Sequence, residues 1–237
     1  MNVSLAGIIL AGGENRRIGK NKAFLKIGNK TFLDILIDKL MPLFSEIIIS
    51  VKSIKEFIGS TPSKYHLTKN VQLIQDILPI RSSLIGIYSA LRSMQSDYGF
   101  VIGCDMPSVP EKLISYLIKS RKGFDVVIPN GSNGLEPLCA LYSKRCLSPM
   151  EQLIKRRDFK IINFFPLASL SCPASQSRRS GEVKVKIINL LDIEKLNNYD
   201  IFNINTIEDL QHLRNSVKNT SKGKRSRKIL AAKAQRH

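Results

Sequence analysis

The sequence predicts an α/β fold in which helices cover both faces of a mostly parallel β-sheet. Short apolar runs of strand length alternate along the chain with stretches of helical periodicity. Polar residues follow three of these runs, at the carboxyl edge where such sheets bind ligands. The chain has 237 residues, enough for one sizeable domain with a hydrophobic core. Together these observations predict a three-layer αβα domain with a Rossmann-like sheet.

The first predicted strand leads into a loop suited to binding phosphate. Residues 5–11 form an apolar run that ends at Gly12-Gly13, and a basic loop with Arg17 and Lys22 follows. Glycine has no Cβ atom, so backbone N–H groups there can approach a ligand closely and can bind an anion in succession. Arg and Lys neutralise phosphate by charge-assisted hydrogen bonds. We therefore expect a polyphosphate site here. The alternative is an ordinary turn before a solvated basic loop.

Two better-known phosphate loops do not fit this segment. A Walker A loop requires G-x-x-x-x-G-K-[ST], whereas five residues separate Gly13 from Gly19 and Asn21 stands at the Ser/Thr position. A dinucleotide-binding loop requires G-x-G-x-x-G, which the glycine doublet does not supply. Both of these classes are excluded.

The remaining strands are predicted from apolar or β-branched runs, which are typical of buried strands. They are residues 46–51, 71–76, 99–107, 124–129, 135–142 and 183–193. Asp76 ends the first strand after residue 70, and Asp105 ends the next. Because the carboxyl ends of parallel strands lie at one edge of a sheet, we expect Gly12, Asp76 and Asp105 to converge there.

Five stretches carry apolar residues at helical spacing and predict helices. They are residues 31–44, 54–58, 82–94, 111–120 and 143–157. Thr31 is the expected N-cap of the first helix, and Ser82 or Ser83 is that of the third. Thr206, followed by Asp209, resembles a capping box that opens a final helix.

Residues 10–25, LAGGENRRIGKNKAFL, resemble the signature of the molybdenum cofactor guanylyltransferase family, which is usually L-A-G-G-x-S-x-R-M-G-x-D-K-A-x-L. The resemblance extends over about residues 4–214 and implies a sheet of the nucleotidyltransferase type. It also implies an enzyme that joins GMP from GTP to the phosphate of molybdopterin and releases pyrophosphate. Asn15, Ile18 and Asn21 replace the usual Ser, Met and Asp.

The resemblance assigns nucleotide contacts and a first pair of catalytic residues. Lys22 ends the signature and would contact the nucleotide phosphates, while Arg17 would clamp the β- and γ-phosphates. The opening residues of the signature would bind the nucleotide with their backbone: Leu10, Ala11, Gly12 and Gly13.

Asp105 is the expected metal ligand and the third catalytic residue. Mg²⁺ usually takes one or two protein carboxylates together with phosphates and water, and a carboxylate at a strand end is placed for that. The tetrapeptide CDMP, residues 104–107, resembles the metal-binding motif of the family and gives this role to Asp105. The alternative is an aspartate that only caps the turn before Pro107.

The two substrates would meet Asp76 and two asparagines. Asp76 corresponds to a family aspartate near the guanine and ribose, and its carboxylate can accept from guanine N1–H and N2–H₂ or from a ribose hydroxyl. The family continues with Gly-Pro-Leu-x-Gly, whereas residues 81–86 read RSSLIG. Asn203 and Asn205 lie where relatives place the pterin substrate, although the same segment could simply cap the last helix.

The charge of the chain is strongly basic and uneven. The formal net charge is +18, and about half of it lies from Arg214 onward, where Lys and Arg occur without Asp or Glu. We predict a nucleotidyltransferase domain at 1–217 and a disordered basic tail at 218–237. The basic body suits phosphate-rich substrates, and the tail could dock an acidic partner protein of molybdoenzyme maturation. The tail has no aromatic residues for base stacking, so nucleic acid is not an expected partner.

Composition also bears on location and mobility. No apolar run approaches the roughly 20 residues of a membrane span, and we find no signal peptide, so we expect a cytoplasmic protein. The four cysteines form no C-x-x-C pair, which predicts reduced, buried thiols. Residues 166–182 are rich in Ser and Pro and predict a mobile surface loop or a lid.

Two alternative functions stay open at this point. A cytidylyltransferase acting on molybdopterin or on another phosphorylated small molecule would use the same phosphate loop and metal-binding aspartate. A protein of this fold that only binds nucleotide or nucleic acid would show no turnover. Nucleotide preference and turnover distinguish the three.

Overall fold

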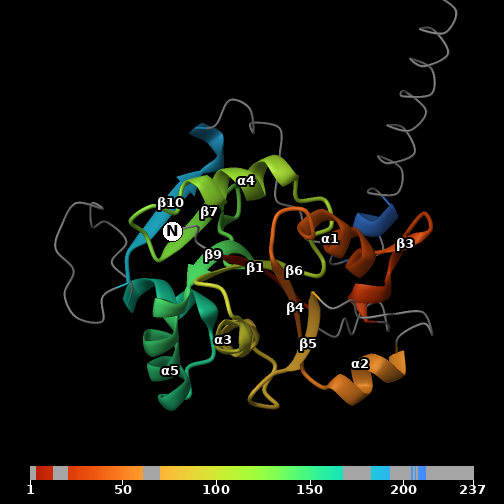
Figure 1. Ribbon diagram of the computed structural model, residues 1–237, viewed down its shortest axis with the longest axis horizontal. Helices are drawn as coiled ribbons and strands as arrows, with labels where there is room; N and C mark the ends of the chain where they lie inside the picture. The colour runs from red at the N-terminus through yellow and green to blue at the C-terminus, as the bar shows by residue number, and fades with distance from the viewer. Residues whose placement is uncertain are drawn as a thin grey trace, which may run out of the picture.

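A mixed β-sheet forms the middle layer of the fold (Figure 1), in a computed structural model that describes residues 4–12, 21–60, 70–167, 183–192, 204, 206 and 208–211. The described strands of this sheet are β1 (Leu5–Leu10), β4 (Glu46–Val51), β5 (Val71–Gln75), β6 (Tyr98–Gly103), β7 (Val126–Gly131), β8 (Gly134–Leu135), β9 (Cys139–Ser143) and β10 (Val185–Asn189). They lie in the order β10-β7-β9-β6-β1-β4-β5, and β8 pairs with β7. β9 runs antiparallel to β6 and β7, while β5, β4, β1 and β6 are mutually parallel. The prediction of a mostly parallel sheet is confirmed.

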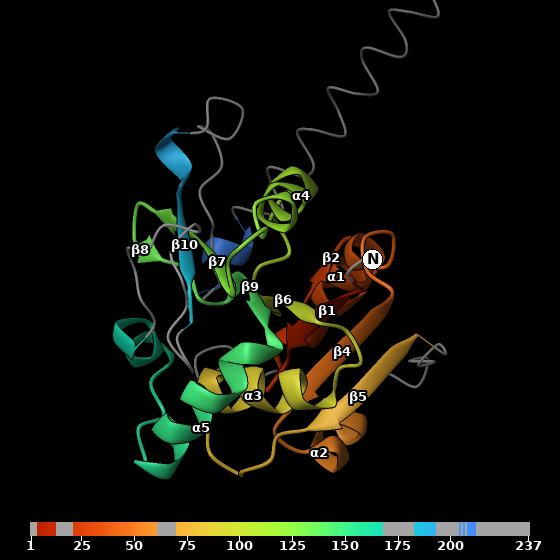
Figure 2. The same ribbon diagram turned by 60° about the vertical axis from the view of Figure 1, so that its left-hand side comes forward.

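Helices cover both faces of this sheet, as Figures 1 and 2 show. One face packs against α1 (Phe32–Leu40) and α4 (Glu111–Lys119), and the other against α3 (Ser83–Ser93) and α5 (Leu147–Lys155). The short α2 (Ile54–Ser60) lies beside the edge strand β5. Each face has its own cluster of buried apolar side chains. The three-layer αβα prediction is therefore confirmed.

Short elements join these layers. They are the 3₁₀ helices η1 (Lys22–Phe24), η2 (Lys144–Cys146), η3 (Ile161–Leu167) and η4 (Leu190–Asp192), and a hairpin of β2 (Lys26–Ile27) and β3 (Lys30–Thr31). The sequence predicted none of them, because two-residue strands and 3₁₀ turns show neither the alternation of a longer strand nor the period of an α-helix.

Local side-chain bonds begin the predicted helices. Thr31 accepts from the Asp34 N–H at 3.0 Å, and the Asp34 carboxylate accepts from the Thr31 N–H at 2.8 Å, which is a capping box for α1. Ser82, rather than Ser83, is the N-cap of α3. Thr206 and Asp209 exchange the same pair of bonds, at 2.8 and 3.1 Å, which confirms the capping box predicted there.

The prediction of one strand over residues 135–142 is wrong. β8 ends at Leu135 and β9 begins only at Cys139. Pro137 lies between them and has no N–H for a sheet ladder. The Glu136 N–H instead donates to the Pro129 carbonyl at 3.0 Å, and the Cys139 N–H turns back to the Glu136 carbonyl at 3.0 Å. Four other predictions run too far: β6 ends at Gly103, α1 at Leu40 and β10 at Asn189, and α5 spans only Leu147–Lys155.

Three of the four cysteines are free and buried: Cys104, Cys139 and Cys146. Burial raises the pKa of Cys104 to about 12, so this thiol stays protonated at neutral pH. Cys172, residues 168–182 of the predicted loop and the predicted tail at 218–237 lie outside the described residues. In the described part of the chain, no helix is long and apolar enough to cross a membrane.

Candidate active site

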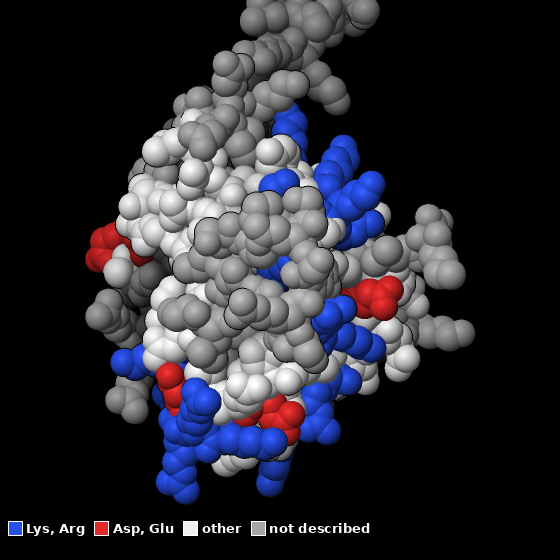
Figure 3. Space-filling model, turned by 90° about the vertical axis from the view of Figure 1, so that its left-hand side faces the viewer, with Lys and Arg blue, Asp and Glu red and all other residues white. Residues whose placement is uncertain are grey.

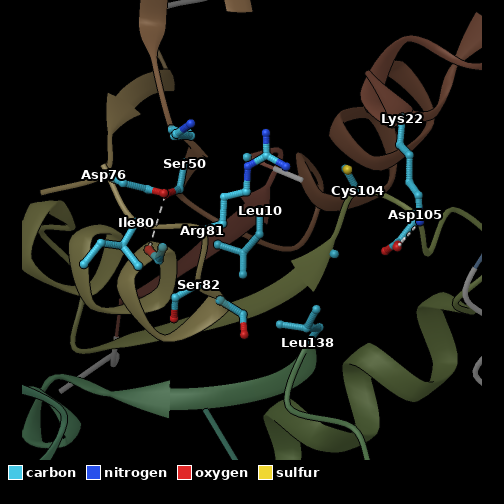
Figure 4. A pocket seen from close by; sticks show the side chains of 15 residues that line it. Leu10, Lys22, Ser50, Asp76, Ile80, Arg81, Ser82, Cys104, Asp105 and Leu138 are labelled. Atoms are coloured by element: carbon cyan, nitrogen blue, oxygen red, sulfur yellow. Dashed lines mark hydrogen bonds and ion pairs between the residues drawn. The ribbon is translucent and has the colours of Figure 1, made fainter. Parts of the chain in front are cut away.

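A cavity of about 350 Å³ opens at the carboxyl ends of β1, β4, β5 and β6 (Figure 4). Its lining comes from six separate segments of the chain: Leu10, Gly12, Lys22, Ser50, Lys52, Asp76, Ile80, Arg81, Ser82, Ser83, Gly86, Gly103, Cys104, Asp105 and Leu138. Gly12, Asp76 and Asp105 all belong to it, so the convergence predicted from the strand ends is observed. Figure 4 shows two polar groups on opposite sides, with Leu10 and Arg81 between them.

The first polar group is an ion pair between Lys22 and Asp105. Lys22 Nζ lies 2.9 Å from Asp105 Oδ2, and the two side chains are 11% and 21% exposed. Lys22 begins η1, whose N-cap is Asn21, and the Asn21 side-chain oxygen accepts from the Ala23 N–H at 3.0 Å. The family signature usually has Asp at this position. The Asn21 amide oxygen accepts the capping hydrogen bond that an Asp carboxylate could accept, so this substitution is compatible with the same local structure.

The backbone fixes Asp105 at the edge of the cavity. The Cys104 N–H donates to the Leu10 carbonyl at 3.1 Å, which ties the turn after β6 to the end of β1. The Asp105 carbonyl accepts from the Ile204 N–H at 3.0 Å, which ties the same turn to the C-terminal segment. A Cβ atom on Gly103 would lie only 2.7 Å from Asp105 Oδ1, so glycine is needed there to leave room for the carboxylate.

The donor set at Asp105 fits Mg²⁺ held jointly with a phosphorylated ligand. Among the described residues, no group of three or more His, Cys, Asp or Glu side chains could hold a metal ion. Mg²⁺ does not need such a cage, because it is commonly bound by one or two carboxylates and completed by phosphate oxygens and water. Glu136 lies near enough that, besides burial, the Asp105 charge raises its pKa. Asp105 therefore offers one carboxylate, which is paired with Lys22, and a cation bound here would take its other ligands from phosphate and water.

The second polar group is Asp76 with Ser50. Ser50 is 1% exposed, and its Oγ donates to Asp76 Oδ1 at 2.5 Å. Burial raises the pKa of Asp76, and the Ser50 hydrogen bond opposes that rise. Gly12 and Gly86 border the carboxylate, since a Cβ atom on either would make ordinary van der Waals contact with an Asp76 oxygen, at 3.6 and 3.7 Å. Asp76 is thus a partly desolvated acceptor with an open side.

Several lining residues were not predicted. Ser50 lies one residue before the end of β4, at the same edge of the sheet, and that position was the available signal for it. Ser82 lies at the first position of the missing Gly-Pro and Arg81 directly precedes it, and the change of residue type there was the signal. Ser82 Oγ donates to the Phe159 carbonyl at 2.5 Å, which links this side of the cavity to the segment after α5. Lys52 is half-buried in the structure, but it was not predicted, because a lysine after a strand usually faces solvent.

The predicted site residues divide into three groups. Leu10, Gly12, Lys22, Asp76 and Asp105 line the cavity together. Ala11 does not line it: this residue is 2% exposed, and its N–H donates to the Ser50 carbonyl at 2.9 Å. The remaining four lie outside the described residues: Gly13, Arg17, Asn203 and Asn205.

This arrangement can bind one elongated anionic ligand. A cation and a carboxylate at one end can hold a phosphate chain with its counter-ion. A carboxylate at the other end can accept from paired N–H groups of a base or from hydroxyl groups. Leu10 and Leu138 supply apolar surface between the ends.

Comparison with known proteins identifies close relatives. The sequence model of the MobA-like NTP transferase domain matches residues 7–165. A "Probable molybdenum cofactor guanylyltransferase" of Pelotomaculum thermopropionicum is 30% identical over 218 residues, covering 92% of this chain and 96% of the relative. A "Molybdenum cofactor guanylyltransferase" of Desulfosudis oleivorans is 37% identical over 151 residues, covering 63% and 70%. The crystal structure of molybdopterin-guanine dinucleotide biosynthesis protein A from Archaeoglobus fulgidus has the same fold, with a TM-score of 0.71 at 23% identity, covering 90% of this chain and 99% of that chain.

Proposed function

The chain belongs to the MobA-like NTP transferase family and is a molybdenum cofactor guanylyltransferase by descent, and we propose that it transfers GMP from GTP to the phosphate of molybdopterin. The observation that carries this proposal is the single cavity that holds Asp76 at one end and the Lys22–Asp105 pair at the other. A nucleoside triphosphate has this layout, with a hydrogen-bonding base at one end and a metal-bound phosphate chain at the other. The names of the relatives favour guanosine over the cytidine alternative.

The reaction would be an in-line displacement at phosphorus. An oxygen of the molybdopterin phosphate attacks the α-phosphorus of GTP; the new P–O bond forms as the bond to the β-phosphate oxygen breaks, and pyrophosphate leaves. The nucleophile is already an anion, so no general base is required. Positioning and charge stabilisation are most of what such a transfer asks of a protein.

The residues of the cavity would divide these tasks. Lys22 would stabilise the α-phosphate and the leaving pyrophosphate, helped by Arg17 from outside the described residues. Asp105 would hold Mg²⁺, which supplies charge compensation on the phosphate oxygens. Asp76 would accept from the guanine N1–H and N2–H₂ groups or from the ribose. Gly12, with Gly13, would bring backbone N–H groups to the phosphates.

The pterin substrate would bind near the C-terminal segment. Ile204 is fully buried, and its N–H donates to the Asp105 carbonyl. This supports a place for the neighbouring Asn203 and Asn205 next to the reacting phosphates. Amide side chains offer both donors and acceptors to the polar edge of a pterin.

The basic surface would serve partners and substrates. On the face shown in Figure 3, Lys and Arg side chains outnumber Asp and Glu side chains. Lys155, Arg156, Arg157 and Lys160 are exposed at the end of α5 and just beyond it. Such a surface attracts anionic substrates and could dock an acidic protein of molybdoenzyme maturation in the cytoplasm.

A competition assay tests the proposed function. The full-length chain, molybdopterin and Mg²⁺ are incubated with equal concentrations of GTP and CTP, and the dinucleotide products are separated and weighed by mass spectrometry. We expect the guanine dinucleotide and an equal amount of pyrophosphate. A cytosine dinucleotide product would indicate the cytidylyltransferase alternative. Nucleotide binding without any dinucleotide product would favour a protein that binds nucleotide without catalysing transfer.

A further inference from the structure

Lys39 connects helix α1 to the loop that follows Asp105. Its Nζ atom donates to the Pro107 carbonyl at 2.7 Å and to the Val109 carbonyl at 2.5 Å, although these residues are 68 and 70 positions away in the chain. Pro107 and Val109 are both buried. Buried backbone carbonyls need hydrogen-bond partners. One ammonium group therefore satisfies and fixes two carbonyls of the same loop.

Asp105 belongs to the same loop as the two carbonyl groups that Lys39 contacts. The Met106 N–H donates to the Gly103 carbonyl at 3.1 Å, and the Val109 N–H donates to the Met106 carbonyl at 3.3 Å. Residues 103–109 are thus two successive tight turns, and Asp105 lies inside the first. Because these hydrogen bonds link successive turns, a shift of Val109 would also displace Asp105.

The other end of α1 is tied to the segment that carries Lys22. The Phe32 N–H, in the first turn of α1, donates to the Leu25 carbonyl at 2.8 Å. The Leu25 N–H in turn donates to the Lys22 carbonyl at 3.1 Å. Helix α1 therefore bridges the two chain segments whose side chains meet as the Lys22–Asp105 pair.

Holding this loop with a lysine costs free energy, because the charged ammonium group is partly desolvated. Burial lowers the pKa of Lys39, and the charge of nearby Glu111 opposes that effect. An apolar side chain would cover the loop without desolvating a charge, but it would leave the two carbonyls without this donor. Only a group with several donors on a long stem can direct bonds to both carbonyls at once. The contact therefore fixes the direction of the loop as well as packing against it.

We propose that Lys39 is a positioning residue for the metal and phosphate site. Lys39 fixes the position of the 103–109 loop relative to α1, and this determines where the Asp105 carboxylate lies relative to Lys22. This inference rests on the proposed function, because it concerns Asp105 as the metal ligand of a GTP-binding site. Lys39 itself does not line the cavity, so it would act through the loop and not on the substrate or the metal.

The test compares Lys39→Met with Lys39→Arg in the full-length chain. Mn²⁺ replaces Mg²⁺ as a spectroscopic probe, and its binding in the presence of GTP is measured by electron paramagnetic resonance without turnover. Amide hydrogen exchange of the peptide covering residues 101–110 reports the loop directly. Two control variants in the same region are Lys30→Met, which removes an exposed ion pair with Asp38, and Leu36→Ala, which destabilises α1 from its fully buried face.

We expect Lys39→Met to weaken Mn²⁺ binding about tenfold and to lower kcat by about 10- to 100-fold, since a misplacement of about 1 Å has effects of this order. Exchange of the loop amides should accelerate, while the KM for GTP changes by less than about threefold, because base and sugar contacts are untouched. Lys39→Arg should restore Mn²⁺ binding, since a guanidinium group can also donate to two carbonyls. Lys30→Met should change nothing.

Two results would overturn the proposal. If Leu36→Ala, at an equal loss of melting temperature, weakens Mn²⁺ binding as much as Lys39→Met does, then Lys39 acts only through stability. If Lys39→Met leaves Mn²⁺ binding and loop exchange unchanged, the loop does not depend on it. Asp105→Ala separates these failures from a failure of the proposed function: if that variant binds Mn²⁺ as the wild type does, the metal assignment itself is wrong, and the positioning role is wrong with it.

Discussion

The Ser50–Asp76 hydrogen bond should set the pH range over which GTP binds. Ionised Asp76 can accept from guanine N–H groups, whereas the protonated carboxyl has lost that capacity on one oxygen. GTP affinity should therefore be full above the pKa of Asp76 and should fall as the pH drops below it. Burial raises this pKa and the Ser50 hydroxyl opposes the rise. Ser50→Ala removes the opposing effect, together with a longer contact of Ser50 Oγ to the Gly86 carbonyl at 3.3 Å, so the pKa of Asp76 should rise further.

The geometry of the Ser50–Asp76 hydrogen bond indicates how strongly it stabilises the ionised carboxylate. Ser50 is buried and its Oγ lies 2.5 Å from Asp76 Oδ1. A hydrogen bond to a charged group contributes about 1.5–3 kcal/mol. One pKa unit corresponds to about 1.4 kcal/mol. Because the bond stabilises the ionised form, its loss should raise the pKa of Asp76 further.

Calorimetric titration with GTP and Mg²⁺ at a series of pH values measures this shift. As the pH is lowered, the GTP affinity of Ser50→Ala should begin to fall at a higher pH than that of the wild type. Ser143→Ala is the matched control, because Ser143 Oγ also bonds a buried carboxylate, Asp125, but at the opposite edge of the sheet. Circular dichroism at each pH confirms that the chain is folded. An unchanged midpoint, or one moved to lower pH, would refute the reasoning.

Three further predictions concern stability and turnover. Because the folded pKa of Asp76 lies above its unfolded value, its stabilising contribution is present at low pH and is lost as the pH rises through that pKa. Asp76→Asn without GTP should therefore melt at or above the wild-type temperature at pH 7, with the gain vanishing on acidification, while GTP affinity falls. Asp105→Ala and Lys22→Met should each lower kcat by about 10²- to 10³-fold in a pyrophosphate-release assay; a loss below about threefold would contradict their assignment. Thr31→Ala should weaken folding by about 1 kcal/mol in urea titration and leave kcat unchanged, and no loss of stability would mean that the capping box contributes nothing.

The sequence predicts the local features of this fold well and the long-range ones poorly. The start of α1 is encoded within four residues, by Thr31 and Asp34, so it could be placed from the sequence alone. The insertion of antiparallel β9 between β6 and β7 depends on which strands pair across the sheet, and no local pattern specifies that. The break of the predicted strand at Pro137 was visible in the sequence, but the apolar run around it obscured the signal.

The same distinction holds for the candidate site. Gly12, Asp76 and Asp105 were found because local patterns show where strands end. A general rule then places the carboxyl ends of parallel strands at the ligand-binding edge of the sheet. The bond between Ser50 and Asp76 joins residues 26 positions apart and could not be predicted from spacing. Lys39 had the appearance of a solvent-facing lysine on an amphipathic helix, and only the folded loop shows what its ammonium group contacts.

The central claim is that one cavity binds GTP between Asp76 and the Lys22–Asp105 pair. The most direct measurement is calorimetric binding of GTP, CTP, ATP and UTP, each with Mg²⁺, to the wild type and to Asp76→Ala. The account predicts selective binding of GTP, by about tenfold or more, and a loss of that selectivity in Asp76→Ala, because the paired guanine N–H groups then lose their acceptor. A preference for CTP, or equal affinity for all four nucleotides in the wild type, would contradict it.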